Sequence, residues 1–241
     1  DEALGKLYDD AKARVESGKL DSVESDLAKV ATQARDPHLR ANATLFLGSL
    51  AEAKEDWRGA VAYYKQARAA VPEEPSTHAV LALALAKLER YPEAVPVQEK
   101  LVEMTPDDLQ AWLILGELRF KAGSEEGATE AYAAYEMRRK GLLDGLTLKK
   151  DGKYVAPSEE RIIIAQNLVP ASDNGTALAL LYALDSDPDP KVGDAIVEVM
   201  GMQRLAGYKL GLEARLAKEL GPESVKMTQW ALAEIARDPM D

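Results

Sequence analysis

The sequence has no cysteine and few aromatic residues, which together make up 6% of its 241 positions. Without cysteine the chain can form no disulfide, no thiolate nucleophile and no sulfur-ligated metal site. No apolar run approaches the roughly 18 residues that a membrane-spanning helix requires. We therefore expect neither thiol chemistry nor a membrane span.

The charged residues are unbalanced toward acid, with 30 Lys and Arg against 41 Asp and Glu and a formal net charge of −11. An acidic chain is repelled by phosphate backbones, so we expect no nucleic-acid partner. Apolar residues make up 46% of the chain, enough for a sizeable core. Alanine and leucine dominate them and β-branched runs are scarce, which predicts an all-α protein.

The chain starts at Asp1 and not at methionine. This start is compatible with a removed targeting segment and with a piece cut from a larger protein. The compartment is therefore left open between the cytoplasm and export, for example to the periplasm. The oligomeric state is left open as well.

Small residues and prolines recur with a spacing of 34 residues. With Ala41 at position 1, Gly48 falls at position 8, Ala60 at position 20 and Pro72 at position 32. Units that start at Pro75 and Leu109 place small residues at the same offsets: Ala82, Ala94, Gly116 and Ala128. Such spacing predicts helical hairpins whose backbones approach at the small residues, with an aromatic residue at position 24 beside them and proline ending the unit.

These offsets resemble the tetratricopeptide repeat, in three units at about 41–74, 75–108 and 109–141, after a degenerate first unit at 2–37. The resemblance implies a right-handed superhelix of helical hairpins over residues 1–145. The sequence departs from the family's pattern at four positions. The family has an aromatic residue where this chain has Thr44, His78 and Gln98, and it has a proline where this chain has Lys140.

Beyond the third unit the 34-residue signature disappears. We expect its last helix to end within 141–145, and a linker or short β-hairpin over 146–157 to turn at Asp151–Gly152. Residues 158–241 are predicted to form an α-helical domain that resembles HEAT-like repeats, with Val192 and Val225 at equivalent places. The helices expected there are 158–168, 174–185, 190–201, 203–220 and 222–237.

No motif in the sequence predicts catalysis or metal binding. His38 and His78 lack further ligands at metal-site spacing, and no phosphate-binding loop or nucleophile motif occurs. The glycosylation triplets that start at Asn42 and Asn174 also fit chance, and Asn174 suits a helix cap. We predict no enzyme activity, no cofactor and no metal.

Alternating acids at Asp185, Asp187 and Asp189 could begin a calcium loop. However, prolines occupy the intervening positions Pro188 and Pro190, and no glutamate closes the loop. A helix capped by Asp189, with proline in its first turn, is the simpler interpretation.

The resemblance implies a binding groove on the first helix of each unit, lined from positions 2, 5, 9, 12 and 13. The lysine and asparagine with which the family's carboxylate-binding grooves grip a C-terminus are absent. An apolar strip with a mixed polar rim remains, which suits an amphipathic or extended protein segment. The predicted partner-binding residues are Asn42, Leu45, Ser49, Glu52, Ala79, Leu83, Lys87, Gln110, Leu113, Glu117, Phe120 and Lys121.

We therefore predict a non-enzymatic adaptor that binds a protein segment in this groove, by analogy within a bacterial multiprotein assembly. Three alternatives stay open. The strip is covered by the chain's own N-terminal helix or C-terminal block, the protein is a self-associating structural subunit, or it is a regulatory domain of a larger protein.

Overall fold

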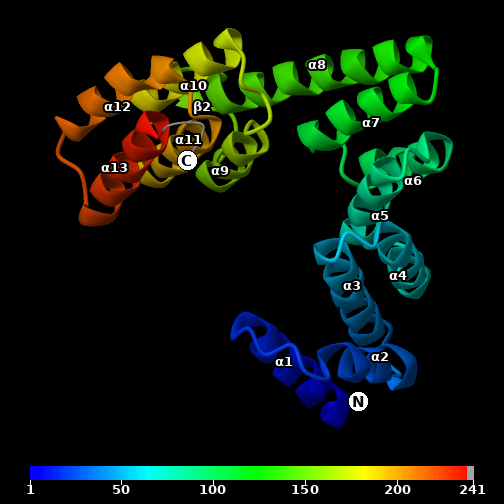
Figure 1. Ribbon diagram of the computed structural model, residues 1–241. Coiled ribbons are helices and arrows are strands. Elements are labelled where there is room, and N and C mark those ends of the chain that lie inside the picture. Colours follow the sequence, from blue (N-terminus) through cyan, green and yellow to red (C-terminus); the bar gives the residue numbers. More distant parts are fainter. Residues whose placement is uncertain (238–241) are drawn as a thin grey trace. The chain divides into compact units, whose positions relative to one another are not determined.

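In a computed structural model of the chain, residues 1–237 are described. They form helices and one small two-stranded sheet (Figure 1), which confirms the predicted all-α class. By their contacts the residues fall into two compact units. The first unit holds 1–106 and 111–131, and the second holds 107–110 and the described chain from 132 onward. The last residues of the predicted 158–241 domain, 238–241, lie outside the described residues.

The first unit is built from successive helices that pack in pairs joined by short turns. Helix α3 (Pro37–Ala53) packs on α4 (Trp57–Ala70), and α5 (Pro75–Lys87) packs on α6 (Tyr91–Met104) (Figure 1). Asp36 and Asp56 cap α3 and α4 by accepting from the amides of His38 and Gly59, each at 2.9 Å. The remaining helices that contribute to this unit are α1 (Glu2–Glu16), α2 (Val23–Gln33), α7 (Leu109–Lys121) and the start of α8 (Glu125–Thr147).

Small residues bring α3 and α4 together, as the repeat pattern predicts. A Cβ atom added to Gly48 would lie 2.2 Å from Cε1 of Tyr64, so only glycine leaves room for that ring. Ala60 is fully buried, and so is Ala94 at the same position of the next unit. The prediction for positions 8, 20 and 24 is thus confirmed in the first full repeat.

The other repeats have no buried aromatic residue at position 24. Gln98 takes this position in the second one, where its buried Nε2 donates to the carbonyl of Ala111 at 2.8 Å and ties α6 to α7. In the third, Tyr132 is 42% exposed. Only the first full repeat therefore fills the space beside the small residues with a buried aromatic ring.

The degenerate first pair, α1 and α2, is joined by charge. Counting 34 residues back from Ala41 places Arg14 at position 8 and Asp26 at position 20, where the later repeats have small residues. The guanidinium Nη2 of Arg14 donates to the carboxylate of Asp26 at 2.6 Å. An ion pair therefore replaces the close packing of small residues at this crossing.

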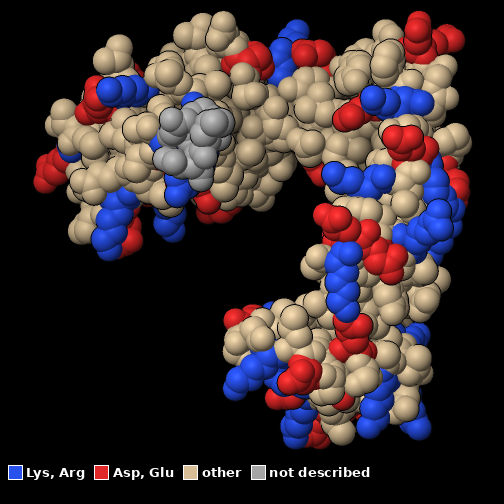
Figure 2. All heavy atoms as spheres, in the orientation of Figure 1, with Lys and Arg blue, Asp and Glu red and all other residues tan. Residues whose placement is uncertain are grey.

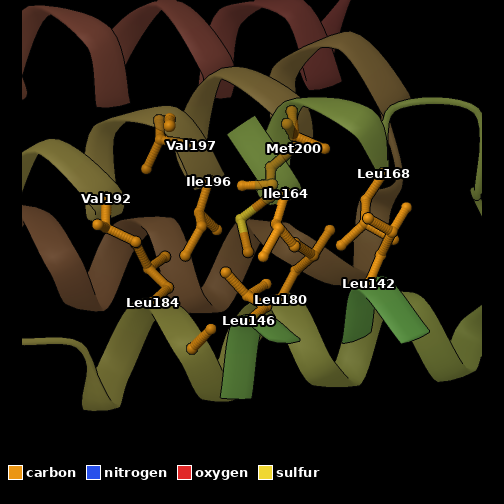
Figure 3. Packing of buried hydrophobic residues seen from close by; sticks show 14 of the residues in the cluster. Leu142, Leu146, Ile164, Leu168, Leu180, Leu184, Val192, Ile196, Val197 and Met200 are labelled. Atoms are coloured by element: carbon orange, nitrogen blue, oxygen red, sulfur yellow. The ribbon is translucent and has the colours of Figure 1, made fainter. Parts of the chain in front are cut away.

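The second unit surrounds helix α11 (Pro190–Gln203), which packs against α9 (Ser158–Asn167), α10 (Asn174–Ser186) and α13 (Pro222–Ala236). The C-terminal part of α8 joins the same core. Leu146, Ile164, Leu180 and Ile196, one from each of α8, α9, α10 and α11, meet in its apolar interior (Figure 3). Most side chains of α11 are buried, so this helix does not need a polar face toward solvent.

The predicted β-hairpin is present. Strand β1 (Lys149–Lys150) pairs antiparallel with β2 (Lys153–Tyr154), and Asp151–Gly152 make the turn with positive φ at both residues. Arg161 of α9 holds the hairpin in place. Its guanidinium lies 4.2 Å from the ring centroid of Tyr154 and donates to the carbonyl of Ala156 at 2.6 Å.

The same arginine makes a buried ion pair. Nε and Nη2 of Arg161 donate to the two carboxylate oxygens of Asp187 at 2.8 and 3.0 Å, and the side chains are 5% and 0% exposed. Such a two-pronged pair satisfies both groups away from water. It connects α9 to the segment that precedes α11.

Two predicted helix ends are wrong. Helix α8 does not stop within 141–145 but runs to Thr147, because Leu142 and Leu146 are buried in the second unit's core. Gly145 serves this packing, since a Cβ atom there would lie 2.9 Å from Cδ1 of Ile164. The division between the units lies at 131/132, inside α8, whereas the domain boundary predicted at 145 stays a prediction.

The single helix expected over 203–220 is also wrong. Arg204 has a left-handed backbone with φ 52°, which ends α11. A short turn, η1 (Ala206–Tyr208), and helix α12 (Lys209–Leu216) follow. The buried Tyr208 donates to Gln203, whose Nε2 in turn donates to the carbonyl of Leu168 at 2.8 Å, so polar contacts fix the break.

Candidate partner-binding groove

A first hollow of about 330 Å³ lies between α1 and α3, in the first unit. Three predicted groove residues, Asn42, Leu45 and Ser49, line it from α3. They fall at positions 2, 5 and 9 of the repeat, which share one face of a helix. The other lining residues are Tyr8, Lys12, Glu16 and Phe46, and the rings of Tyr8 and Phe46 meet edge to face at 6.3 Å.

A second hollow of about 230 Å³ is lined from α5, the start of α6, and α7. Leu83, Lys87 and Glu117 of the predicted set line it, and Leu83 is 47% exposed. Leu83 and Glu117 occupy position 9, as Ser49 does in the first hollow. Equal positions on stacked repeats face the same side, so both hollows belong to one groove face. Ala86, Tyr91, Ile114 and Leu118 complete the lining.

The remaining predicted residues do not line either hollow. Ala79 and Leu113 are half-buried between helices, and Glu52 is half-buried on α3. Phe120 and Lys121 are exposed at the end of α7, with Phe120 56% exposed. Gln110 is exposed and falls in the second unit by its contacts. The structure therefore gathers six of the twelve predicted residues into hollows.

Sequence reasoning missed the wall that α1 contributes. Tyr8, Lys12 and Glu16 stand one helical turn apart, a spacing that places them on one face of α1. These residues were not predicted to line the groove, because the degenerate first unit lacks the small residues that set the repeat's phase. The signal that was available is this spacing itself, one aromatic and two charged residues at i, i+4 and i+8.

The hollows carry charges without ion-pair partners among the described residues. Lys12 and Glu16 line the first, Lys87 and Glu117 the second, and none of the four is in a salt bridge. Lys87 Nζ lies 5.7 Å from the ring centroid of Trp57, a cation–π distance. Each hollow therefore offers one positive and one negative group beside apolar side chains.

Tyr64 lies behind this face and is a structural residue. Its ring is 1% exposed, and burial raises the pKa of Tyr64 to about 12. A group with this pKa stays neutral at physiological pH.

Over the rest of the surface, positive and negative side chains are interspersed on the face shown in Figure 2.

The other residues that the sequence singled out have structural contacts. His78 is buried beside Thr77 and the Glu74 carbonyl, and His38 is exposed. Asp189 accepts from the amide of Lys191 at 2.9 Å, which confirms its predicted cap. The cap predicted at Asn174 is wrong, since the neighbouring Asp173 caps α10 instead.

Within 1–237, no group of three or more acidic or histidine side chains is arranged to hold a metal ion. No helix in the same range combines the length and hydropathy that crossing a membrane requires.

Comparison with known protein families supports the repeat assignment. The family model described as tetratricopeptide repeat matches residues 45–108 and again 79–141. Residues 45–141 are tetratricopeptide repeats. Tetratricopeptide repeats in general form protein-interaction scaffolds and are generally non-enzymatic. The HEAT-like character of the block beyond residue 158 stays a prediction.

Other comparisons add little to this assignment. The structure titled "Crystal structure of MamA protein" aligns with a TM-score of 0.39 and 15% sequence identity, over 80% of this chain and 91% of that chain. A score this low supports no statement about shared function. No curated protein matches the chain.

Proposed function

We propose that the tetratricopeptide array binds an apolar segment of a partner protein along its groove face, as a non-enzymatic adaptor. The observation that carries the proposal is the pair of hollows, of about 330 and 230 Å³, each of which is lined by a residue at position 9 of a repeat. Each is large enough for a bulky side chain and has aromatic and leucine side chains in its lining. Buried apolar anchors in such pockets supply most of the energy of peptide recognition.

The charges of the hollows define the partner further. The chain as a whole carries a net charge of −11, but each hollow pairs one lysine with one glutamate. A balanced rim attracts a segment that carries both signs and gives no general preference for a basic one. We therefore propose an amphipathic helix or an extended segment with two apolar anchors and charges of both signs. A role in a bacterial assembly rests on analogy with other repeat arrays alone.

Substitution of Leu83 by glutamate tests the groove. The new carboxylate would enter the second hollow beside Glu117, where like charges repel and the apolar anchor loses its contact. The matched control is Leu20→Glu, because Leu20 is also an exposed leucine of the first unit, at 62% exposure, and lines neither hollow. Both variants should keep the helical circular dichroism of the parent protein.

Partners captured from native lysate and identified by mass spectrometry provide the readout. A genuine groove ligand is retained by the parent protein and by Leu20→Glu, and lost by Leu83→Glu. Equal retention by all three proteins would discard the groove as the binding surface. Light scattering of the purified protein separates the self-association alternative, since a groove adaptor is monomeric without its partner.

A further inference from the structure

A separate hollow lies in the second unit, between α11 and α13. It has a volume of about 320 Å³, and its apolar lining consists of Met202, Met227 and Trp230. Met202 is 53% exposed and Trp230 is 38% exposed, although both are large apolar residues. A hollow that exposes tryptophan and methionine has the composition of a protein-binding hot spot. We call it the α11–α13 pocket.

The tryptophan of this pocket packs closely against α11. Gly201 faces it, and a Cβ atom on that glycine would lie 2.5 Å from Cζ3 of Trp230. The ring therefore rests on the backbone of α11 while part of it faces solvent. The two methionines beside it are flexible and adapt to ligands of different shape. An aromatic ring that rests on a helix backbone, with adaptable neighbours, suits a side chain that inserts from another molecule.

The charges at the pocket are acidic in sum. Glu198 and Glu223 line it together with Lys226, and Lys226 Nζ is already paired with Glu223 at 2.9 Å. Glu198 has no hydrogen bond or ion pair within the described part of the chain. Its carboxylate is left to attract a cation, and the face of Trp230 attracts one as well.

We propose that the α11–α13 pocket docks a basic segment of a partner protein, in which an apolar side chain stands next to an arginine or lysine. The apolar side chain fills the space between the methionines and Trp230, and the cation pairs with Glu198. A second copy of this acidic chain is a poorer occupant, because its net charge of −11 opposes close approach. This site is independent of the groove on the tetratricopeptide array.

Selection from a displayed library of short random peptides tests the proposal on the full chain. The parent protein is compared with Glu198→Lys, with Trp230→Ala and with a matched control, Glu219→Lys, an exposed glutamate of the same unit outside the pocket. Peptides kept by the parent and the control but lost by Glu198→Lys should carry an apolar residue beside Arg or Lys. The affinity of such a peptide should fall roughly tenfold or more in either pocket variant.

Methyl labelling of methionine then locates the peptide. The Met202 and Met227 signals should shift on addition of a selected peptide, while those of Met104 and Met137 stay unchanged. Leu83→Glu should leave this binding intact, which separates the pocket from the groove. Because Glu198→Lys does not touch the packing of Trp230 on Gly201, it remains informative even where Trp230→Ala disturbs folding.

Three results would overturn the proposal. In the first, no selected peptide distinguishes the parent from Glu198→Lys. In the second, the peptides that do distinguish them lack a basic residue. In the third, the Met202 and Met227 signals shift with protein concentration in the absence of peptide, which would show that a second copy covers the pocket.

Discussion

Replacing Gly48 by alanine tests the packing on which the repeat array depends. The added Cβ would lie 2.2 Å from Cε1 and 2.7 Å from Cδ1 of Tyr64, well inside van der Waals contact. The ring is 1% exposed and enclosed by buried neighbours, so it cannot swing out to solvent. The two helices α3 and α4 must therefore separate, or the ring must leave its preferred rotamer.

Two effects of opposite sign determine the magnitude. Overpacking a close-packed core costs typically about 1–3 kcal/mol, whereas alanine in a helix is favoured over glycine by roughly 1 kcal/mol. We expect a net loss of about 1 kcal/mol in the free energy of unfolding. Gly5→Ala is the matched control, because Gly5 lies in helix α1 of the same unit and a Cβ there meets nothing within 4 Å. The difference between the two substitutions isolates the packing cost.

Urea denaturation followed by far-ultraviolet circular dichroism measures both changes. Gly5→Ala should be neutral or slightly stabilising, and Gly48→Ala should lower the midpoint. In a Tyr64→Leu background the alanine at 48 should no longer cost stability, since the clashing ring is gone. The reasoning is refuted if Gly48→Ala stabilises the protein as Gly5→Ala does, or if its cost persists without the tyrosine ring.

Two further substitutions follow from the ion pairs. Arg161→Met leaves the buried carboxylate of Asp187 without its partner and should cost about 3 kcal/mol, whereas Lys218→Met breaks an exposed pair and should change the thermal midpoint little. The hydrogen bond from Arg14 holds the pKa of Asp26 below its ordinary value of 3.8, so the pair stabilises α1 and α2 above that pH and is lost as pH falls through the folded pKa. Asp26→Asn should weaken the protection of α1 amides from hydrogen exchange at neutral pH. In this variant the protection should no longer decrease when Asp26 of the parent protein would become protonated.

The repeat phase was predictable from sequence because it depends on residue size at fixed offsets. Gly48, Ala60 and Ala94 are small for a reason that holds in every repeat of this kind, namely the approach of two backbones. The ends of α8 and α11 were not predictable in the same way. Glycines in 141–145 indicated a helix end, but burial of Leu142 and Leu146 overrode their weak helix propensity.

The groove was predictable in part. Positions 5 and 9 led correctly to Leu45 and Leu83 because the offset along a repeat fixes the face on which a residue lies. Tyr8 and Tyr91 also line the hollows, but they come from elements outside the first helices of the three full repeats. Their place depends on how neighbouring helices meet in space. The spacing of residues within one repeat does not predict that arrangement.

The second unit illustrates the same limit. Gly193 follows the buried Val192 in α11. Arg215 of α12 lies over Gly193 and donates to Asp194 at 2.7 Å. A Cβ atom on Gly193 would lie 2.4 Å from Nη1 of Arg215, so a larger residue at this place would displace the guanidinium. A contact between residues so distant in sequence cannot be derived from the local pattern.

Three contacts between helices of the first unit depend on different physical means, and this has a functional consequence. Steric fit at Gly48 is insensitive to pH, and so is the amide contact of Gln98, whereas the Arg14–Asp26 pair weakens in acid. Helix α1 supplies one wall of the first hollow, and the second hollow is lined by helices that do not depend on this pair. Protonation of Asp26 should therefore loosen α1 and weaken binding at the first hollow. A partner anchored in both hollows would lose one anchor and the avidity that two provide, so its affinity would fall in acid before the helical content of the array does.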